Sequence, residues 1–515
     1  MSHVFITWGD LTRLACDAWL VPTDSRLVLE APWAEYVQAP AAPDRWGAPD
    51  ARVVEGRPRK ERDERTPWLL DLGGSPGTDL QWYVDGVRQF VNAAAARVRD
   101  RTPLFGRAKP LLAMPLVGAR YGGSAERAGQ LVSRLLPVLG ELAAAHEADL
   151  ALVLYSSRAF AGAQAARRHA GGVPSPELSP PAVQEAERLA RLAAEGRLVL
   201  FLGAGVSAGA GLPTWNDLLD LLAAEAGIPI AERQSLARLE ERDRALVIEG
   251  RLRLQGSNLG QHVARSFRDS PWRSLTHTQL AALPVSEAAT TNYDTLFEDA
   301  RHDIGRQTTV LPYELVAEDP CWLLKLHGCV KHPDDIVLTR DDYLRYNERR
   351  AALAGILQAL LVTRHMLFVG FSLRDENFHR IMHDVRKALR LPGARSREPF
   401  GTALLLRRYP FLDELWRDDL HLAYLGEEAE QPAPAARRLQ IFLDHVLHRS
   451  TTTVGHLLDE AYDAVLDEDE RAAREALRAL KAALPASPGA TPAWKRVAAF
   501  LHSVGDRPDP DERGR

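Results

Sequence analysis

Short apolar runs alternate with amphipathic segments along most of the chain. In the first third, four runs suit buried strands, and two longer segments have the spacing of apolar residues typical of a helix. The strand candidates lie at 4–7, 18–21, 111–114 and 150–155, and the helix candidates at 83–98 and 126–146. This alternation predicts an α/β layer structure. Residues 38–75 are rich in proline, glycine and charge, and we expect an irregular loop there.

A second patterned region follows a stretch rich in proline, glycine and serine. It opens with helical spacing at 186–193, followed by five consecutive apolar residues at 198–202, as in a strand buried on both faces. Further strand candidates lie at 286–290, 322–326, 366–369 and 403–406. The pattern divides the chain into an α/β domain at 1–170, a linker at 171–182, a parallel-sheet domain at 183–450, and a helical extension with a disordered end at 451–515.

Composition narrows the possible partners and sites. The net charge of −5 gives no support for a nucleic-acid partner. No apolar run reaches the roughly 20 residues that span a bilayer, and the first residues lack the features of a signal peptide. We therefore expect a soluble, cytoplasmic protein with no membrane partner. Three cysteines without a Cys-x-x-Cys pair exclude a four-cysteine zinc site, and we expect no metal.

The apolar run at 198–202 leads directly into a turn of small residues, Gly203-Ala204-Gly205-Val206-Ser207. Small residues let the backbone approach a pyrophosphate closely, and the amides at the start of a following helix can bind it. A tight strand–helix turn without a ligand is the alternative. Three later strand candidates also end in polar clusters, at 291–294, 327–328 and 370–372. Because ligands bind at the carboxyl ends of parallel strands, these clusters point to one crevice.

Taken in order, the clusters resemble those of the sirtuin superfamily. The matching segments are Gly203-Ala204-Gly205-Val206-Ser207, Thr291-Asn292-Tyr293-Asp294, Leu326-His327-Gly328 and Gly370-Phe371-Ser372-Leu373. The resemblance covers about residues 183–450 and implies a Rossmann-like domain that binds NAD and cleaves its nicotinamide–ribose bond.

Departures from the family pattern separate its branches. The four-cysteine zinc module of the family deacylases has no counterpart among three cysteines. Thr214-Trp215-Asn216 replaces an acidic-aromatic-arginine segment, and Arg374-Asp375-Glu376-Asn377 follows the last cluster. This variant pattern is similar to the zinc-less sirtuin-like domains of bacterial antiphage defence proteins, which typically hydrolyse NAD.

Each candidate residue takes an expected role from this resemblance and from its chemistry. We expect His327 to act as general base and Asn292 to orient water or a ribose hydroxyl. Asp375 either contacts a ribose or caps the following helix. The residues expected to contact NAD are Gly203, Ala204, Gly205, Ser207, Trp215, Thr291, Asp294, Gly370, Ser372 and Asp375.

The first domain resembles macro domains, which bind ADP-ribose. The resemblance rests on Gly9-Asp10-Leu11-Thr12 and on a glycine-containing loop at 116–123. It implies a ligand site that includes Asp10, Gly118, Tyr121 and Gly122. Pro22-Thr23-Asp24 replaces the usual asparagine-rich segment, which favours a binder or sensor over a hydrolase. An α/β domain that only docks partners remains the alternative.

These resemblances predict an NAD hydrolase effector of antiphage defence that depletes NAD. We expect it to be gated by an ADP-ribose-like signal nucleotide or a phage-derived trigger, and to form a homo-oligomer. Two alternatives stay open: an NAD-dependent deacylase or ADP-ribosyltransferase, and a non-catalytic nucleotide-binding regulatory module.

Overall fold

The computed structural model describes residues 1–73, 78–119, 125–173, 176–267, 271–316, 321–389, 398–483 and 491–505. The chain forms two compact units. One unit joins Met1–Ser179 to Ile441–Arg515, and the other consists of Pro180–Gln440. The second boundary falls within helix α16 (Pro432–Ser450). No helix in the described part of the chain is long and apolar enough to cross a membrane.

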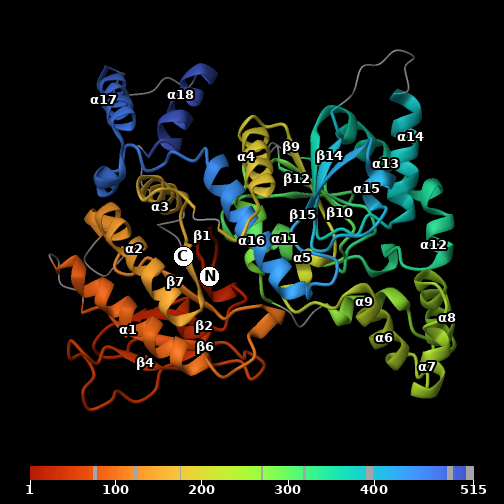
Figure 1. Cartoon of the computed structure of the whole chain (residues 1–515), viewed down its shortest axis with the longest axis horizontal. Helices are drawn as coiled ribbons and strands as arrows, with labels where there is room; N and C mark the ends of the chain where they lie inside the picture. Colours follow the sequence, from red (N-terminus) through yellow and green to blue (C-terminus); the bar gives the residue numbers. More distant parts are fainter. Residues whose placement is uncertain are drawn as a thin grey trace. The chain divides into compact units, whose positions relative to one another are not determined.

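The first unit is built on a six-stranded sheet (Figure 1). Its strands are, in spatial order, β1 (Val4–Trp8), β8 (Asp149–Leu154), β7 (Leu111–Pro115), β2 (Ala18–Thr23), β6 (Thr66–Asp71) and β4 (Val53–Glu55). All neighbours are parallel except β6 and β4. The helices are α1 (Leu80–Val98), α2 (Ala128–His146) and α3 (Ser157–His169). The predicted strands and both predicted helices of this region are confirmed.

The expectation of an irregular loop at 38–75 is wrong. Strand β6 lies within this segment, pairs with β2 and β4, and is buried at every position. Short strands β3 (Val37–Gln38) and β5 (Arg57–Pro58) pair nearby. The apolar run at 68–70 is short and bounded by Pro67 and Asp71, so the polar composition of its surroundings obscured it.

The C-terminal segment belongs to the first unit, whereas the sequence pattern set the boundary at 450 and treated the remainder as a separate extension. Asp444 on α16 is fully buried, with its carboxylate 2.8 Å from His3 Nε2 and 3.0 Å from Arg167 Nη1. Burial acts to raise the pKa of Asp444, but Arg167 and His3 outweigh it and hold the pKa below its usual value. The segment continues through η6 (Glu460–Val465), α17 (Glu468–Ala483) and α18 (Pro492–Ser503). The end expected to be disordered, 506–515, lies outside the described residues.

Two helical glycines offer a matched test of this packing. A Cβ at Gly162 on α3 would overlap the ring of Tyr462, whereas a Cβ at Gly140 on α2 would meet no described atom within 4 Å. We expect Gly162→Ala to destabilise the protein by about 1–3 kcal/mol because the added methyl overpacks the contact. Gly140→Ala should stabilise it by about 0.5–1 kcal/mol. Urea unfolding midpoints measure both, and a stable Gly162→Ala protein would contradict the packing of Tyr462 on α3.

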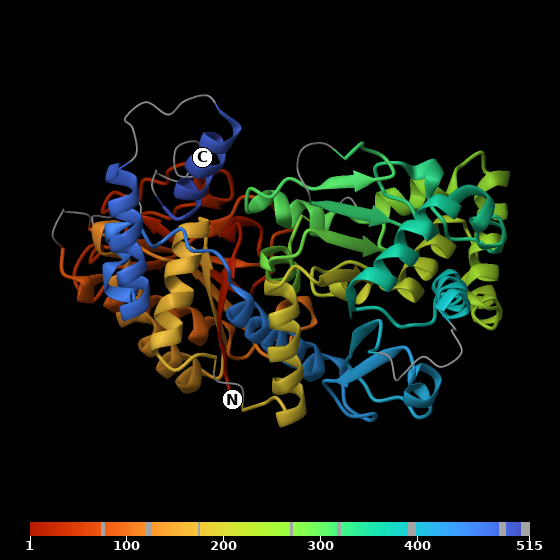
Figure 2. The ribbon, with the colours of Figure 1, turned by 90° about the horizontal axis from the view of Figure 1, so that it is seen from above.

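In the described part of the second unit, seven strands form one sheet, and each is parallel to its neighbours. Several of these strands, drawn in green, lie side by side in Figure 2. Their spatial order is β11 (Thr309–Leu311), β12 (Trp322–Lys325), β10 (Glu287–Thr290), β9 (Leu198–Leu202), β13 (His365–Val369), β14 (Gly401–Leu405) and β15 (Leu420–Tyr424). The chain first builds outward from β9 through β10 and later returns to place β13 on the other side of β9. This reversal of direction is a topological switch point, where open parallel sheets bind ligands. The sheet fits the predicted Rossmann-like architecture.

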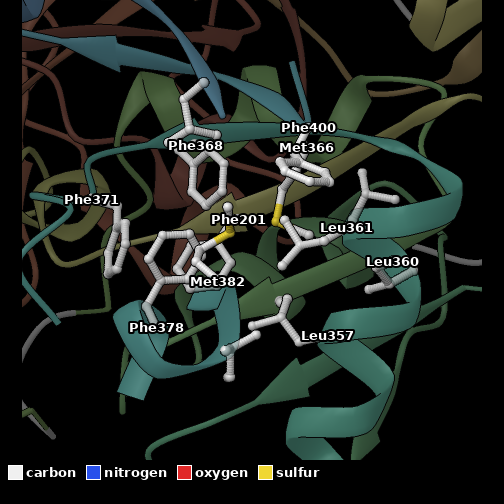
Figure 3. Close-up of a cluster of buried hydrophobic side chains, with 14 of the residues drawn as sticks. Phe201, Leu357, Leu360, Leu361, Met366, Phe368, Phe371, Phe378, Met382 and Phe400 are labelled. Atoms are coloured by element: carbon white, nitrogen blue, oxygen red, sulfur yellow. The ribbon is translucent and has the colours of Figure 1, made fainter. Parts of the chain in front are cut away.

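One face of this sheet is covered by α13 (Tyr346–Thr363) and α14 (Glu376–Leu389), which enclose an aromatic core (Figure 3). The ring of Phe201 on β9 lies 5.1 Å from Phe368, 4.6 Å from Phe371 and 5.5 Å from Phe378, measured between centroids. Helix α4 (Pro180–Ala194) also contacts β9. The core therefore fixes the ends of β9 and β13 from which the polar clusters emerge.

Four helices between β9 and β10 form a separate hydrophobic cluster. They are α6 (Trp215–Glu225), α7 (Ile230–Leu236), α8 (Glu241–Leu254) and α9 (Leu259–Ser266). Tyr293, from the polar cluster after β10, is buried against this group, and its hydroxyl donates to Val337 O at 2.8 Å. The helical cluster thereby holds one wall of the site.

Candidate functional site

A pocket of about 320 Å³ opens at the carboxyl ends of the central strands of the second unit. It brings together residues from all four predicted clusters. Of the predicted residues, the pocket is lined by Ala204, Gly205, Ser207, Trp215, Thr291, Asn292, Asp294, His327, Gly370, Ser372 and Asp375. Gly203 lies outside the lining, but its carbonyl contacts Asn292. Segments separated by about 170 residues of chain therefore meet at the topological switch point.

The glycine turns after β9 and β13 pack directly on each other. A Cβ at Gly203 would lie 2.5 Å from Gly370 O, and a Cβ at Gly205 would lie 2.9 Å from Gly370 Cα. Gly370 also has a positive φ of +66°, which favours glycine. The small residues here are thus required by contact between two backbones.

Several amides of this turn bond within the protein. Gly205 N donates to Gly370 O at 2.9 Å, Val206 N to Gly203 O at 3.0 Å, and Ser207 N to Ala204 O at 3.0 Å. The helix that follows, α5 (Gly205–Ala208), is a single turn. This differs from the expected cradle of amides for a pyrophosphate. Side chains such as Ser207 are left as the polar groups that the turn presents to the pocket.

Asn292 stands at the centre of a hydrogen-bond network. Its Nδ2 donates to Gly203 O at 3.1 Å and to Ser207 Oγ at 3.2 Å. Ser207 Oγ donates in turn to Asp294 Oδ2 at 2.8 Å. The other amide atom, Asn292 Oδ1, has no hydrogen-bond partner within the described ranges. The network fixes the rotation of the amide and leaves its carbonyl oxygen to accept a hydrogen bond.

A buried ion pair between Lys325 and Glu298 stabilises the segment that carries this network. Lys325, at the end of β12, is fully buried, donates to Asp294 O and lies 2.9 Å from Glu298 Oε1. Burial acts to lower the pKa of Lys325, but Glu298 outweighs it and the pKa is raised, so the ammonium stays charged. The positive charge therefore anchors the main chain of the Asn292–Asp294 segment.

His327 lies in the same pocket and is only 2% exposed. Burial lowers its pKa below the usual value, Asp375 acts to raise it, and Arg350 lowers it further. The imidazole is therefore neutral at neutral pH, the state in which it can accept a proton. Asp375 also accepts from Phe378 N at 2.8 Å. It therefore caps α14, which is one of the two roles expected for it, the other being a contact with a ribose.

The sequence pattern does not mark the lining residues Glu241, Arg242 and Tyr343, and it contains Arg374 only within the variant segment after the last cluster. The guanidinium of Arg242 lies 4.9 Å from the ring centre of Tyr343 and 2.5 Å from Glu376 Oε2. Arg242 and Tyr343 come from helices α8 and α12 (Arg340–Leu344), away from any strand end. No motif in the sequence marks them, because only the fold brings these helices to the pocket.

The candidate site in the first unit is described only in part. Asp10 Oδ1 accepts from Thr12 N at 2.8 Å and from Thr12 Oγ1 at 2.7 Å, so this carboxylate caps the short helix η1 (Leu11–Arg13). Gly118 adopts a positive φ of +78° in a turn after β7. Tyr121 and Gly122 lie outside the described residues. The resemblance to macro domains stays a prediction.

Within the described ranges, no group of three or more His, Cys, Asp and Glu side chains is arranged to hold a metal ion.

Comparison with known proteins bears on the second unit. Residues 286–423 match the SIR2-like domain family. This match includes Asn292, His327 and the Gly370 turn, which confirms the predicted likeness to sirtuins for this part of the chain.

The chain is also similar to three curated proteins. It is 31% identical over 200 residues to the NAD(+) hydrolase ThsA of Bacillus cereus (strain MSX-D12), covering 38% of this chain and 41% of that protein. It is 30% identical over 210 residues to the NAD(+) hydrolase ThsA of Enterococcus faecium, covering 40% and 43%. Defense-associated sirtuin 2 of Bacillus subtilis is 28% identical over 202 residues, covering 37% and 19%. The chain thus spans less than half the length of each of these relatives.

Proposed function

We propose that this protein hydrolyses NAD to nicotinamide and ADP-ribose as an effector of bacterial antiphage defence. The observation that carries the proposal is the meeting of Asn292 and His327 in one pocket at the switch point of a parallel sheet. The SIR2-like match and the relatives named NAD(+) hydrolase support the same activity.

The chemistry follows from the charge that develops as nicotinamide leaves. The ribose becomes oxocarbenium-like, and a neutral imidazole can take the proton of the water that attacks it. His327 is neutral and lines the pocket. Asn292 has a fixed amide with a carbonyl oxygen that can orient the water or a ribose hydroxyl.

The remaining lining residues bind the substrate in this proposal. Ser372 supplies a hydroxyl for phosphate, Ser207 Oγ can accept from a ribose hydroxyl while it donates to Asp294, and Trp215 covers the nicotinamide end. Because the amides of Gly205, Val206 and Ser207 bond internally, Arg374 provides positive charge for the pyrophosphate in this proposal. Ala204, Gly205 and Gly370 let the dinucleotide approach the backbone, Thr291 and Asp294 complete the wall, and Gly203 contributes through its carbonyl, which holds Asn292.

We further propose that the first unit regulates cleavage by binding an ADP-ribose-like nucleotide or a phage-derived trigger. Such regulation requires the ligand to bind the resting and active states with different affinity. The proposal places the protein in the cytoplasm, because an NAD hydrolase that depletes the cell must act where NAD is. It also includes assembly into a homo-oligomer.

Product analysis tests the hydrolysis. The purified full chain is incubated with NAD, with and without added ADP-ribose, and the products are separated by chromatography. We expect equal amounts of nicotinamide and ADP-ribose. Nicotinamide release that requires an acylated peptide would show a deacylase, and transfer of ADP-ribose to protein would show a transferase. Binding of NAD without any cleavage in either condition would overturn the proposal in favour of a regulatory module.

A further inference from the structure

His327 faces a carboxylate that the protein holds from two sides. Tyr343 donates from its hydroxyl to Asp375 Oδ2 at 2.8 Å, and the same Oδ2 lies 3.5 Å from His327 Nε2. The second carboxylate oxygen, Oδ1, accepts from Phe378 N at 2.8 Å. Both oxygens of Asp375 are thus engaged by protein groups, which fixes the orientation of the carboxylate.

The nitrogen that faces Asp375 is buried. His327 Nε2 has no hydrogen-bond partner in the part of the chain that the structure describes. Its 3.5 Å separation from Asp375 exceeds a formed hydrogen bond, which measures about 2.7–3.2 Å, but allows ion pairing. Catalytic hydrogen bonds are often long in the absence of substrate and shorten when it binds. His327 lines the pocket, and Nδ1 is its other ring nitrogen.

We propose that Asp375 is a positioning residue that holds His327 with Nε2–H toward its carboxylate, so that Nδ1 accepts the proton, and that Tyr343 fixes Asp375 for this role. This inference rests on the proposed hydrolysis of NAD. It specifies which ring nitrogen of His327 accepts the proton in that reaction. As water forms its bond to the ribose carbon, the bond to nicotinamide breaks and its electron pair leaves with neutral nicotinamide. The water proton passes to His327 Nδ1, and the resulting imidazolium is stabilised by Asp375 before it loses the proton to solvent.

The charged and polar groups around His327 determine whether each substitution raises or lowers its pKa. Asp375 lies at the start of α14, Arg350 lies on α13, and the rings of Tyr343 and Tyr346 lie edge-on at 5.5 and 6.0 Å. Burial raises the pKa of Tyr343 well above its usual value, so its hydroxyl remains a donor to Asp375. Loss of the carboxylate charge removes the group that raises the pKa of His327. Loss of the Tyr343 hydroxyl frees the carboxylate to attract the imidazolium more strongly.

Two variants and a matched control separate this role from simple packing. In the full-length protein, Asp375→Asn keeps an N-cap acceptor for α14 and should lower kcat by about 10- to 100-fold with little change in KM. It should move the acid limb of the pH–rate profile to lower pH, whereas Tyr343→Phe should move it to higher pH. Tyr346→Phe is the control, because its hydroxyl bonds to no group in the described part of the chain and does not line the pocket.

A second readout does not depend on turnover. The ring protons of His327, identified by their loss in His327→Ala, report its pKa by NMR. We expect the pKa to fall in Asp375→Asn, to rise in Tyr343→Phe and to stay constant in Tyr346→Phe. Unchanged His327 titration in all three variants would overturn the inference, as would a raised KM with unchanged kcat in Asp375→Asn, which would show a ribose ligand. If the wild-type protein cleaves no NAD, the proposed function fails, but the NMR titration still decides the assignment of Asp375.

Discussion

Replacement of His327 by alanine is expected to lower the rate of NAD cleavage by about 10²- to 10⁴-fold, the usual contribution of a general base. The side chain is neutral because burial lowers its pKa, and it shares the pocket with Asn292. Asn292→Ala should cause a comparable loss, since it removes the amide that bonds Gly203 and Ser207. The rate of nicotinamide release at saturating NAD measures both effects.

The matched control is His383→Ala, a histidine that is exposed on α14. This variant should cleave NAD at the wild-type rate. Circular dichroism and the urea midpoint establish that the His327 and Asn292 variants remain folded. A folded His327→Ala protein that cleaves NAD at the wild-type rate would contradict the assignment of His327 as the base. It would leave the proposed hydrolysis of NAD standing.

Lys325→Met is expected to destabilise the protein by about 3–5 kcal/mol, because it leaves the carboxylate of Glu298 buried without its partner. The ammonium also bonds the main chain of Asp294, so the variant should weaken NAD binding as well. Urea unfolding measures the first effect, and the KM for NAD measures the second.

A double variant distinguishes loss of the ion pair from loss of packing. Lys325→Met combined with Glu298→Leu removes both charges and should recover most of the lost stability, because replacing a buried pair by apolar groups is often neutral. The KM should remain raised, since the bond to Asp294 O is still missing. If the double variant is as unstable as Lys325→Met, then Lys325 stabilises the unit through its packing and its main-chain bond.

The parts of the fold that the sequence predicted are those with strong local signals. Strands such as β9 and β13 are buried at every position and read as continuous apolar runs between turns. Strands β11 and β15 at the sheet edges are short or half-exposed, so their patterns are weak. Strand β6 was missed for another reason: its apolar run is embedded in a polar, proline-containing segment.

The candidate site divides in a similar way. Asn292 and His327 each lie two residues beyond the end of a strand, and the geometry of a parallel sheet is enough to predict that they meet. Tyr343 and Arg242 come from helices whose spacing carries no such information. Lys325 could not be recognised either, because a lysine at the end of a strand is usually solvated and only the fold places Glu298 against it.

The discontinuity of the first unit has a consequence for how the protein is made. Domains generally fold as units during synthesis, in the order in which they leave the ribosome. His3 and Arg167 emerge early, but their partner Asp444 is made only after all of Pro180–Gln440. The unit that contains the pocket is therefore complete in sequence while the first unit still lacks part of its core. On a translating ribosome, the proposed enzyme precedes its proposed regulator.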